Sequence, residues 1–317
     1  MTSFFFNPEV TFGSKALEVL YICIGLICIY AGFKNLKDKE NPSRVGTFVF
    51  WLSLGLATAL GRYLPPIVEG ILVVITIIPA ILRKVKPGKS EAPTTEETKK
   101  NFENIGMKLF IPALSMGIFA LLFGIFTPFG MSAIVGTGVG VIFAIILMMI
   151  WNKDNKPKVF LNDSERFLSI VGPLSLLPTL LAILGAIFTL AGVGDVIASI
   201  VGNIIPAGNM TVGIIVFALG MMLFTMIMGN AFAAITVMTV GIGAPFVLSL
   251  GADPVVVGML ALTCGYCGTL CTPMAANFNI VPVAILEMKD RWGVIKMQVV
   301  PALIMITVQI IMMIEMA

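Results

Sequence analysis

The amino-acid sequence predicts an all-α polytopic membrane protein with about eight transmembrane helices, one re-entrant helical hairpin and one broken helix. Of its 317 residues, 58% are hydrophobic and 12% are charged, whereas a soluble domain has roughly 25% charged residues. The Lys and Arg residues lie in four groups, and long apolar runs separate these groups. A helix needs about 20 apolar residues to cross a bilayer core of ~30 Å. Each of these runs is long enough for at least one such helix.

The composition also argues against several classes of function. The chain has no histidine, which is the commonest zinc ligand and general base, so we expect neither a bound cofactor nor enzymatic activity. The formal net charge is only +3, so the sequence shows no electrostatic footprint for a nucleic acid. The lipid bilayer is the first partner that the sequence predicts.

The distribution of positive charge predicts the orientation of the chain. Cytoplasmic loops of membrane proteins are enriched in Lys and Arg, which places all four basic groups in the cytoplasm and both termini outside. The groups lie at 34–44, 83–108, 153–166 and 289–296. Residues 167–288 include neither Lys nor Arg, so we expect the turns of that stretch that reach water to lie outside.

Residues 1–82 form the predicted N-terminal three-span region. One span covers 15–33, and two more fill 46–82 with a turn at 62–66. Residues 83–108 are polar and include Pro, Thr and Glu clusters, which is typical of a linker that ends in a short capped helix. We expect this linker to lie in the cytoplasm.

Residues 109–190 are predicted to form scaffold-like helices. Two spans lie within 106–151 and are joined by a turn at 127–130, where Pro and Gly interrupt the apolar run. A third span is expected over 167–190. The connection between them carries the third basic group and is therefore expected in the cytoplasm.

Residues 191–317 are expected to form a transport-type repeat: an amphipathic helix, a hairpin, a broken helix and a last span. The amphipathic helix covers 192–205, which is too short and too glycine-rich for a span. Its apolar residues recur at three-to-four spacing with Asp195, Ser199 and Gly202 opposite, a pattern typical of a helix in the membrane interface. A loop with one helical turn is the alternative.

The hairpin is predicted for residues 211–249, an apolar run that is interrupted in the middle by Gly229 and Asn230. Two full spans would have the same charge pattern. We favour a re-entrant hairpin because a turn in water usually carries several polar residues, whereas a lone Asn is a good ligand. Irregular backbone at membrane depth is tolerated where it lines a cavity.

A second interruption lies within the apolar run 255–286. Pro273 lacks a backbone donor and clashes with the preceding turn, so a helix usually stops or kinks there. The polar residues Thr269, Thr272, Asn277 and Asn279 gather around it. A simple proline kink is the alternative for this break taken alone.

Together the two interruptions predict a binding site for one carboxylate. Secondary transporters build such sites from broken helices, whose N-termini point at the anion while freed carbonyls hold a coupling cation. Because no charged residue is expected at mid-membrane depth, Na⁺ near Asn230 and Asn277 is favoured over a proton as the coupling ion. The expected substrate-binding residues are Gly229, Asn230, Thr269, Thr272, Pro273, Asn277 and Asn279.

The residues around both interruptions resemble known transporters. Segments 228–235, 251–254 and 272–277 are similar to the C-terminal repeat of the ion-transporter superfamily, which includes the divalent-anion symporters. Those symporters have Ser-Asn-Thr at the tip and Thr-Pro-Pro-Asn at the break, whereas this chain has Gly-Asn-Ala at the tip and a longer spacing from Pro273 to Asn277.

A closer resemblance covers most of the chain. Residues 267–282, Cys-Gly-Thr-Leu-Cys-Thr-Pro-Met-Ala-Ala-Asn-Phe-Asn-Ile-Val-Pro, are similar to the domain-of-unknown-function family 979 of bacterial permease proteins. The resemblance implies one of two subunits of a 5-oxoproline transporter in the bacterial cytoplasmic membrane, acting by symport with an elevator-type mechanism. Superfamily members have two inverted repeats, and only one is evident here, so we expect a second membrane subunit or a homo-oligomer.

Two other classes of function remain as alternatives. A lipid-modifying membrane enzyme usually gathers His, Asp, Glu or Arg at one membrane face, and this chain has few such residues beyond 160. A non-transporting assembly subunit would tolerate alanine at Asn230, Thr272 and Asn277. The spacing of Cys264, Cys267 and Cys271 is suggestive of redox chemistry, but we expect these residues to pack as small apolar side chains.

Overall fold

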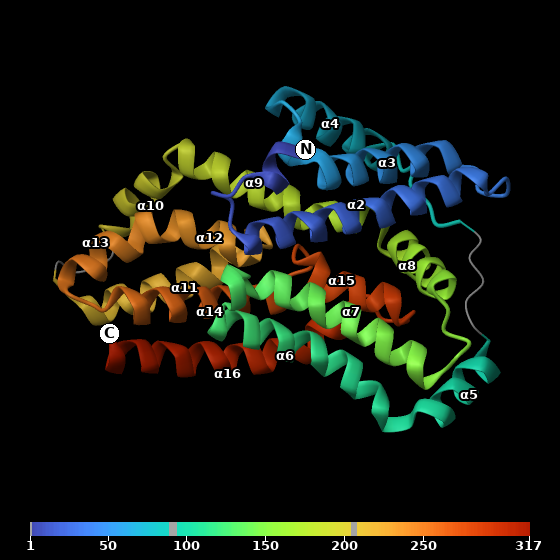
Figure 1. Ribbon diagram of the computed structural model, residues 1–317. Coiled ribbons are helices and arrows are strands. Elements are labelled where there is room, and N and C mark those ends of the chain that lie inside the picture. The colour runs from blue at the N-terminus through green and yellow to red at the C-terminus, as the bar shows by residue number, and fades with distance from the viewer. Residues whose placement is uncertain (1, 89–93, 204–207) are drawn as a thin grey trace. The chain divides into compact units, whose positions relative to one another are not determined.

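The computed structural model describes residues 2–88, 94–203 and 208–317 (Figure 1). Within these ranges helices are the only regular secondary structure, and seven of them are long and apolar enough to cross a bilayer. An eighth crossing results if a pair of helices bent by 67° counts as one span. These findings confirm the predicted class, an all-α membrane-spanning protein.

The chain folds into two compact units, Met1–Gly172 and Pro173–Ala317. The helices of the first unit are α1 Thr2–Phe6, α2 Phe12–Lys37, α3 Arg44–Leu60, α4 Pro66–Ile81, α5 Thr95–Ile105, α6 Phe110–Phe126, α7 Ala133–Trp151 and α8 Pro157–Val171. Short 3-10 segments at Gly61–Tyr63 and Pro128–Gly130 form the two turns that the sequence predicts between spans.

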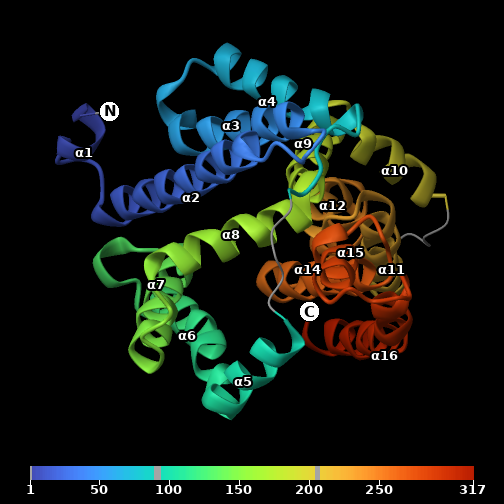
Figure 2. The ribbon, with the colours of Figure 1, turned by 90° about the vertical axis from the view of Figure 1, so that its right-hand side faces the viewer.

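Helices α2 and α3 pack as an antiparallel pair in the first unit (Figure 2). Their backbones touch at two glycines: a Cβ on Gly25 would lie 2.5 Å from the Gly55 carbonyl oxygen, and one on Gly55 would lie 2.7 Å from that of Gly25. Small residues permit such close approach in lipid, where helices gain little from apolar burial alone. Helix α4 packs on α3, and the hydroxyls of Thr76 and Ser53 are 2.8 Å apart.

A buried carboxylate joins α8 to α2. The Glu165 side chain is only 3% exposed, and its Oε2 lies 2.9 Å from Lys34 Nζ. Its Oε1 accepts hydrogen bonds from Asn35 Nδ2 at 2.9 Å and from Ser169 Oγ at 2.8 Å. Burying a charge is costly unless it is paired and hydrogen-bonded, and this carboxylate has both kinds of partner.

Helix α5 confirms the short capped helix expected at the end of the linker. Thr94 is its N-cap, and a reciprocal capping box joins Thr94 and Glu97. The Glu97 carboxylate accepts from the Thr94 amide at 2.9 Å, and these hydrogen bonds from Thr94 lower the pKa of Glu97. The carboxylate half of this cap is therefore strongest at neutral pH and weakens as the pH falls through that lowered pKa, while the Thr94 hydroxyl oxygen still accepts from the Glu97 amide. Residues 89–93 of the linker lie outside the described ranges.

The second unit contains the two predicted interruptions. Its helices are α9 Leu177–Leu190, α10 Val193–Val201, α11 Met210–Met228, α12 Ala231–Met238, α13 Ala244–Phe246, α14 Pro254–Leu270, α15 Ala276–Ile285 and α16 Gly293–Met316. A π-helical turn at Thr239–Gly243 and a 3-10 turn at Leu248–Leu250 extend the arm that α12 begins.

The prediction of one continuous span over 167–190 is wrong. Helix α8 ends at Val171, Gly172 adopts φ +49° and ψ −130°, and α9 begins only at Leu177. These angles lie outside the α-helical region and are tolerated because glycine has no Cβ, so the α-helix ends at this residue. The end of α8 could not be predicted from hydrophobicity, because apolar residues lie on both sides of Gly172.

Helix α10 forms the central part of the segment that the sequence predicts as an amphipathic helix. Its Gly194 packs closely on Val237 and Val240, while Val196 and Ile200 are each 58% exposed. A positive φ of 72° at Gly192 separates it from α9. Ile204 and Ile205, which the prediction included, lie outside the described residues.

Helix α11 runs antiparallel to the arm that follows it, so the chain forms a helical hairpin in this unit. Gly213 at the start of α11 packs on the backbone of Phe246, and Gly220 packs on Met238. The arms Met210–Met228 and Ala231–Leu250 contain 19 and 20 residues. Fully buried Phe217 and Met221 of α11 join the core that α14 and α16 complete.

Candidate functional site

The hairpin reverses direction at Gly229 and Asn230. Helix α11 ends there because Gly229 adopts φ +70°, a conformation that glycine takes without a Cβ penalty. The Gly229 amide donates to the Thr225 carbonyl at 2.6 Å. Asn230 is the N-cap of α12, and its Oδ1 accepts from the amides of Phe232 at 2.9 Å and Ala233 at 3.3 Å. The Asn230 side-chain oxygen is therefore occupied in capping α12.

The broken helix lies at the predicted position. Helix α14 ends at Leu270 and α15 begins at Ala276, with Pro273 between them. Thr272 Oγ1 accepts from the Met274 amide at 3.2 Å, a local side-chain bond that stabilises a turn in place of a helix. The polypeptide therefore leaves the helical path over residues 271–275.

The hairpin tip and the helix break lie in direct contact, although the sequence separates them by more than 40 residues. Thr272 Oγ1 donates to the Met226 carbonyl at 2.8 Å. Gly229 packs on Met274, where an added Cβ would lie 2.6 Å from both the carbonyl carbon and the carbonyl oxygen. Gly229 and Thr272 are both buried. The structure thus brings the two predicted polar segments into one place.

Asn279 supports the break from inside the unit. It is fully buried, and its Nδ2 donates to the Thr269 carbonyl at 2.7 Å and the Thr272 carbonyl at 2.6 Å. A helix that stops leaves such carbonyls without intrahelical partners. Within the described residues, Asn279 Oδ1 is a buried oxygen with no hydrogen-bond donor. Thr269 is also buried, and its hydroxyl donates to the Tyr266 carbonyl at 2.7 Å.

Pro273 and Asn277 lie on the outside of the same segment. Both are exposed, and within the described part of the chain no residue makes a hydrogen bond to the side-chain amide of Asn277. Residues two apart on an α-helix point about 200° apart, which explains why Asn277 faces outward while Asn279 is buried. The predicted site residues therefore divide into an interior group and an outward-facing group.

Backbone dipoles supply the positive potential at this position. Helix α12 begins at the tip and α15 begins at the break, and a helix N-terminus carries roughly half a positive charge. Ala275 at the start of α15 has no side chain that caps the helix. Since residues 167–288 contain neither Lys nor Arg, an anion here would be held by amides and hydroxyls.

The sequence analysis missed Thr225 and the backbone groups of Met226 and Met274. Thr225 is fully buried, and in the described structure its Oγ1 has no hydrogen-bond partner. It lies one turn before Gly229 and follows a run without polar side chains from Val212 to Phe224, a signal that the sequence does contain. The part played by the Met226 carbonyl could not be predicted from the sequence, because every residue has a backbone carbonyl.

The cysteines of α14 lie in the core, as expected for packing residues. Cys264 and Cys267 are buried in the apolar core that α14 shares with α11 and α16, and half-buried Cys271 packs against this core. Cys267 Sγ is 3.5 Å from Gln309 Oε1 on α16. Their contacts are those of small side chains between two helices.

Several span-length apolar helices and a hairpin tip that rests on a helix break define a multi-pass helical membrane protein. No curated protein and no solved structure matches the chain. The chain belongs to the family described as Protein of unknown function (DUF979), which matches residues 18–317. The family extends through both units and includes all of the predicted site residues.

Proposed function

We propose that the protein is a subunit of a secondary active transporter that moves a small organic anion across the bacterial cytoplasmic membrane. The observation that supports this most directly is the contact of the hairpin tip with the helix break, 2.8 Å from Thr272 Oγ1 to the Met226 carbonyl. Transporters bind anions where the N-termini of broken helices converge. Helices α12 and α15 begin at this contact.

The side-chain amides of half-buried Asn230 and exposed Asn277 are the proposed anion ligands. Asn230 uses Oδ1 for its own helix, which leaves Nδ2 as a donor, and among the described residues neither Oδ1 nor Nδ2 of Asn277 has a partner. Gly229 allows close backbone approach, while Thr269, Thr272 and Asn279 hold the break open from inside. A carboxylate that loses its water at membrane depth needs such donors.

The substrate class that we propose is a small monocarboxylate, with 5-oxoproline as the candidate from the family resemblance. Its carboxylate suits the two helix N-termini, and its lactam N–H and C=O suit a primary amide such as Asn277, which both donates and accepts. The ring carries no positive charge, so the absence of acidic residues at the site creates no mismatch.

We propose Na⁺ as the coupling ion of this symport, bound in the region of Asn230 and Asn277. A cation site needs oxygen ligands that are not already hydrogen-bonded. Within the described structure, buried Asn279 Oδ1 and Thr225 Oγ1 have no partner, and Asn277 Oδ1 is also available. Unwound carbonyls and amide oxygens are the groups that hold Na⁺ in transporters of this kind.

The transporter that we propose works as an elevator and is not complete as one chain. In this mechanism the transport-type repeat of residues 191–317, which carries the site, moves through the membrane relative to scaffold-like helices. Because one hairpin and one broken helix provide half of a two-repeat site, a second membrane subunit or a second copy of the chain supplies the rest.

The proposed orientation places both termini outside and the hairpin tip within the membrane, entered from outside. Both hairpin arms are long enough to cross, so accessibility is the decisive measurement. With an impermeant maleimide, Lys156→Cys is expected to label from the cytoplasm and Asp195→Cys from outside. Asn230→Cys should be shielded from the cytoplasm. Cytoplasmic labelling of Asn230→Cys as strong as that of Lys156→Cys would make the arms ordinary spans.

Uptake of labelled 5-oxoproline into membrane vesicles with an imposed Na⁺ gradient tests the function. Losing one hydrogen bond to a charged group costs about 1.5–3 kcal/mol, which is roughly ten- to a hundredfold in affinity. Asn277→Ala and Asn230→Ala are each expected to weaken uptake at least roughly tenfold. Uptake is measured in vesicles that contain this chain alone and in vesicles that also contain its candidate partner subunit. The comparison distinguishes a homo-oligomer of this chain from an assembly with a second subunit.

Asn209→Ala is the matched control, because Asn209 caps α11 through the Val212 amide at 3.1 Å, away from the tip. It should lose a helix cap and keep uptake. Normal uptake in both Asn230→Ala and Asn277→Ala would favour an assembly subunit over a transporter. Uptake that is independent of Na⁺ would refute the coupling ion and leave the anion site in place.

A further inference from the structure

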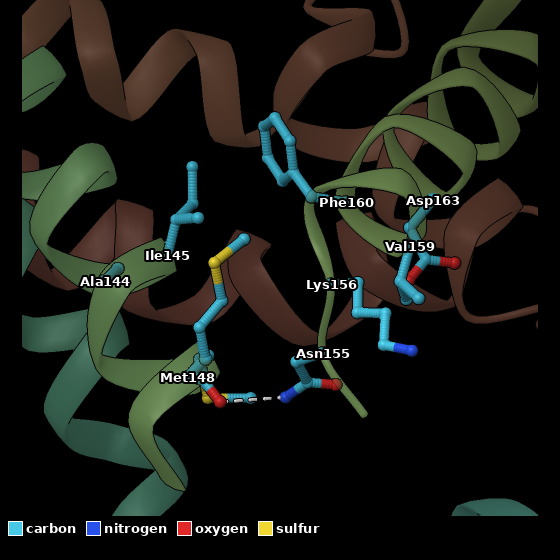
Figure 3. A pocket seen from close by; sticks show the side chains of 9 residues that line it. Ala144, Ile145, Met148, Asn155, Lys156, Val159, Phe160 and Asp163 are labelled. Carbon is cyan, nitrogen blue, oxygen red and sulfur yellow. Dashed lines mark hydrogen bonds between the residues drawn. The ribbon is translucent and has the colours of Figure 1, made fainter. Parts of the chain in front are cut away.

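A cleft lies in the first unit where α7 ends and α8 begins, a part of the fold that the transport site does not use. Its volume is about 250 Å³. Figure 3 shows Ile145 and Met148 of α7 on one side of the cleft, with Val159, Phe160 and Lys156 on the other. The cleft therefore has mainly apolar walls, with Lys156, Asn155 and the carboxylate of Asp163 among the residues that line its polar edge.

The connection between the two helices holds Lys156 at this edge. Asn155 Nδ2 donates to the Met148 carbonyl at 3.0 Å, which closes the turn onto the end of α7 (Figure 3). The Lys156 amide donates to the Asp154 carbonyl at 2.9 Å. The Lys156 side chain is exposed and forms no ion pair with another of the described residues, so its ammonium group is available for a ligand.

The charge around the cleft is positive once the ion pairs are considered. Asp163 lies 3.5 Å from Arg166, and Glu165 lies 2.9 Å from Lys34. These acids are thus balanced by partners. The remaining charges are Lys153 and Lys156 against Asp154 on the connection, together with Lys158 in the first turn of α8, and all three lysines are exposed. An anion is the ligand that this charge favours.

The size of the cleft and its walls point to the end of a lipid rather than to an enclosed metabolite. Ligand pockets usually hold roughly 300–1,000 Å³ and bury most of their ligand, and this cleft is smaller and open. Val159 is 41% exposed, so an apolar chain that continues into the bilayer would cover it. Trp151 at the end of α7 is a residue type enriched at the membrane interface.

We propose that this cleft binds an anionic phospholipid, with the phosphate at Lys156 and the first part of an acyl chain between Met148 and Val159. Basic pockets between membrane helices bind acidic headgroups in this way. A soluble phosphate would use only the lysine, and a neutral lipid would use only the walls. The combination of both features is what selects an anionic lipid.

Lipid binding to the purified full-length protein in a neutral maltoside detergent tests the proposal. Dioleoyl phosphatidylglycerol should raise the unfolding temperature and remain bound in native mass spectra. Dioleoyl phosphatidylcholine and glycerol 3-phosphate should do neither. Lys156→Ala should weaken phosphatidylglycerol binding about fivefold, and Val159→Asp should weaken it at least as much. Lys99→Ala, which removes an exposed charge on α5, should leave it unchanged.

Three results would overturn the proposal. Equal effects of phosphatidylcholine and phosphatidylglycerol would show binding by the acyl chain alone. Equal protection by glycerol 3-phosphate would show a simple anion site. Unchanged phosphatidylglycerol binding in both Lys156→Ala and Val159→Asp would place the lipid elsewhere, and the two variants differ enough that a folding defect in one leaves the other informative.

Discussion

Alanine in place of Gly229 is expected to separate the hairpin tip from the helix break and to abolish uptake. The added Cβ would lie 2.6 Å from the carbonyl carbon and oxygen of Met274, and these are backbone atoms that cannot rotate away. The φ of +70° at Gly229 adds strain for any L-residue, about 1–2 kcal/mol, and overpacking adds about 1–3 kcal/mol. The unfolding temperature in detergent should fall by more than about 5 °C.

Gly258→Ala provides the control within the same unit. Gly258 lies inside α14, and an added Cβ there would meet no atom within 4 Å. Alanine at a helical glycine with space around it is expected to be neutral or to stabilise by about 0.5–1 kcal/mol. If Gly229→Ala unfolds at the wild-type temperature and transports normally, the tight contact of tip and break is not needed for function.

Removing Lys34 is expected to destabilise the first unit strongly. The Glu165 side chain is only 3% exposed, whereas the Lys34 side chain is 37% exposed. Breaking a buried ion pair from one side typically costs about 3–5 kcal/mol, because the remaining charge is left uncompensated. Since Lys34 is partly solvated, we expect Lys34→Met to cost about 3 kcal/mol, measured by thermal or denaturant unfolding.

The double variant Lys34→Met with Glu165→Gln distinguishes a charge effect from a packing effect. Glutamine keeps the shape and still accepts from Asn35 and Ser169, so most of the lost stability should return. Lys37→Met, an exposed lysine one turn away on α2, should have little effect. If the double variant is no more stable than Lys34→Met, the aliphatic stem of the lysine and not its charge holds α8 on α2.

Most of the helices could be predicted because hydrocarbon thickness constrains the length of an apolar run. The turns at Gly61–Tyr63 and Pro128–Gly130 were visible as Pro and Gly within such runs. The end of α8 at Val171 was not visible, since apolar residues continue on both sides of Gly172. Hydrophobicity reports burial in lipid but does not report the φ of one glycine.

The candidate site was predictable as two interruptions and not as a set of contacts. Gly229, Asn230 and Pro273 stand out because polar or helix-breaking residues are rare within apolar runs. The bond from Thr272 to the Met226 carbonyl has no sequence signal on its acceptor side. The inward position of Asn279 could have been inferred from helical spacing only if the start of α15 were known.

The contact between tip and break also has a consequence for the synthesis of the protein. Met226 leaves the ribosome 46 residues before Thr272. At a synthesis rate of about 5–20 residues per second, Thr272 is made roughly 2–9 s after Met226. During this time the hairpin tip lacks the hydroxyl that binds it. Helix α15, with ten residues, rises only about 15 Å and is too short to cross the bilayer unaided. Helix α15 is therefore expected to enter the membrane against the earlier helices of the unit, whereas α16, with 24 residues, is long enough to cross by itself.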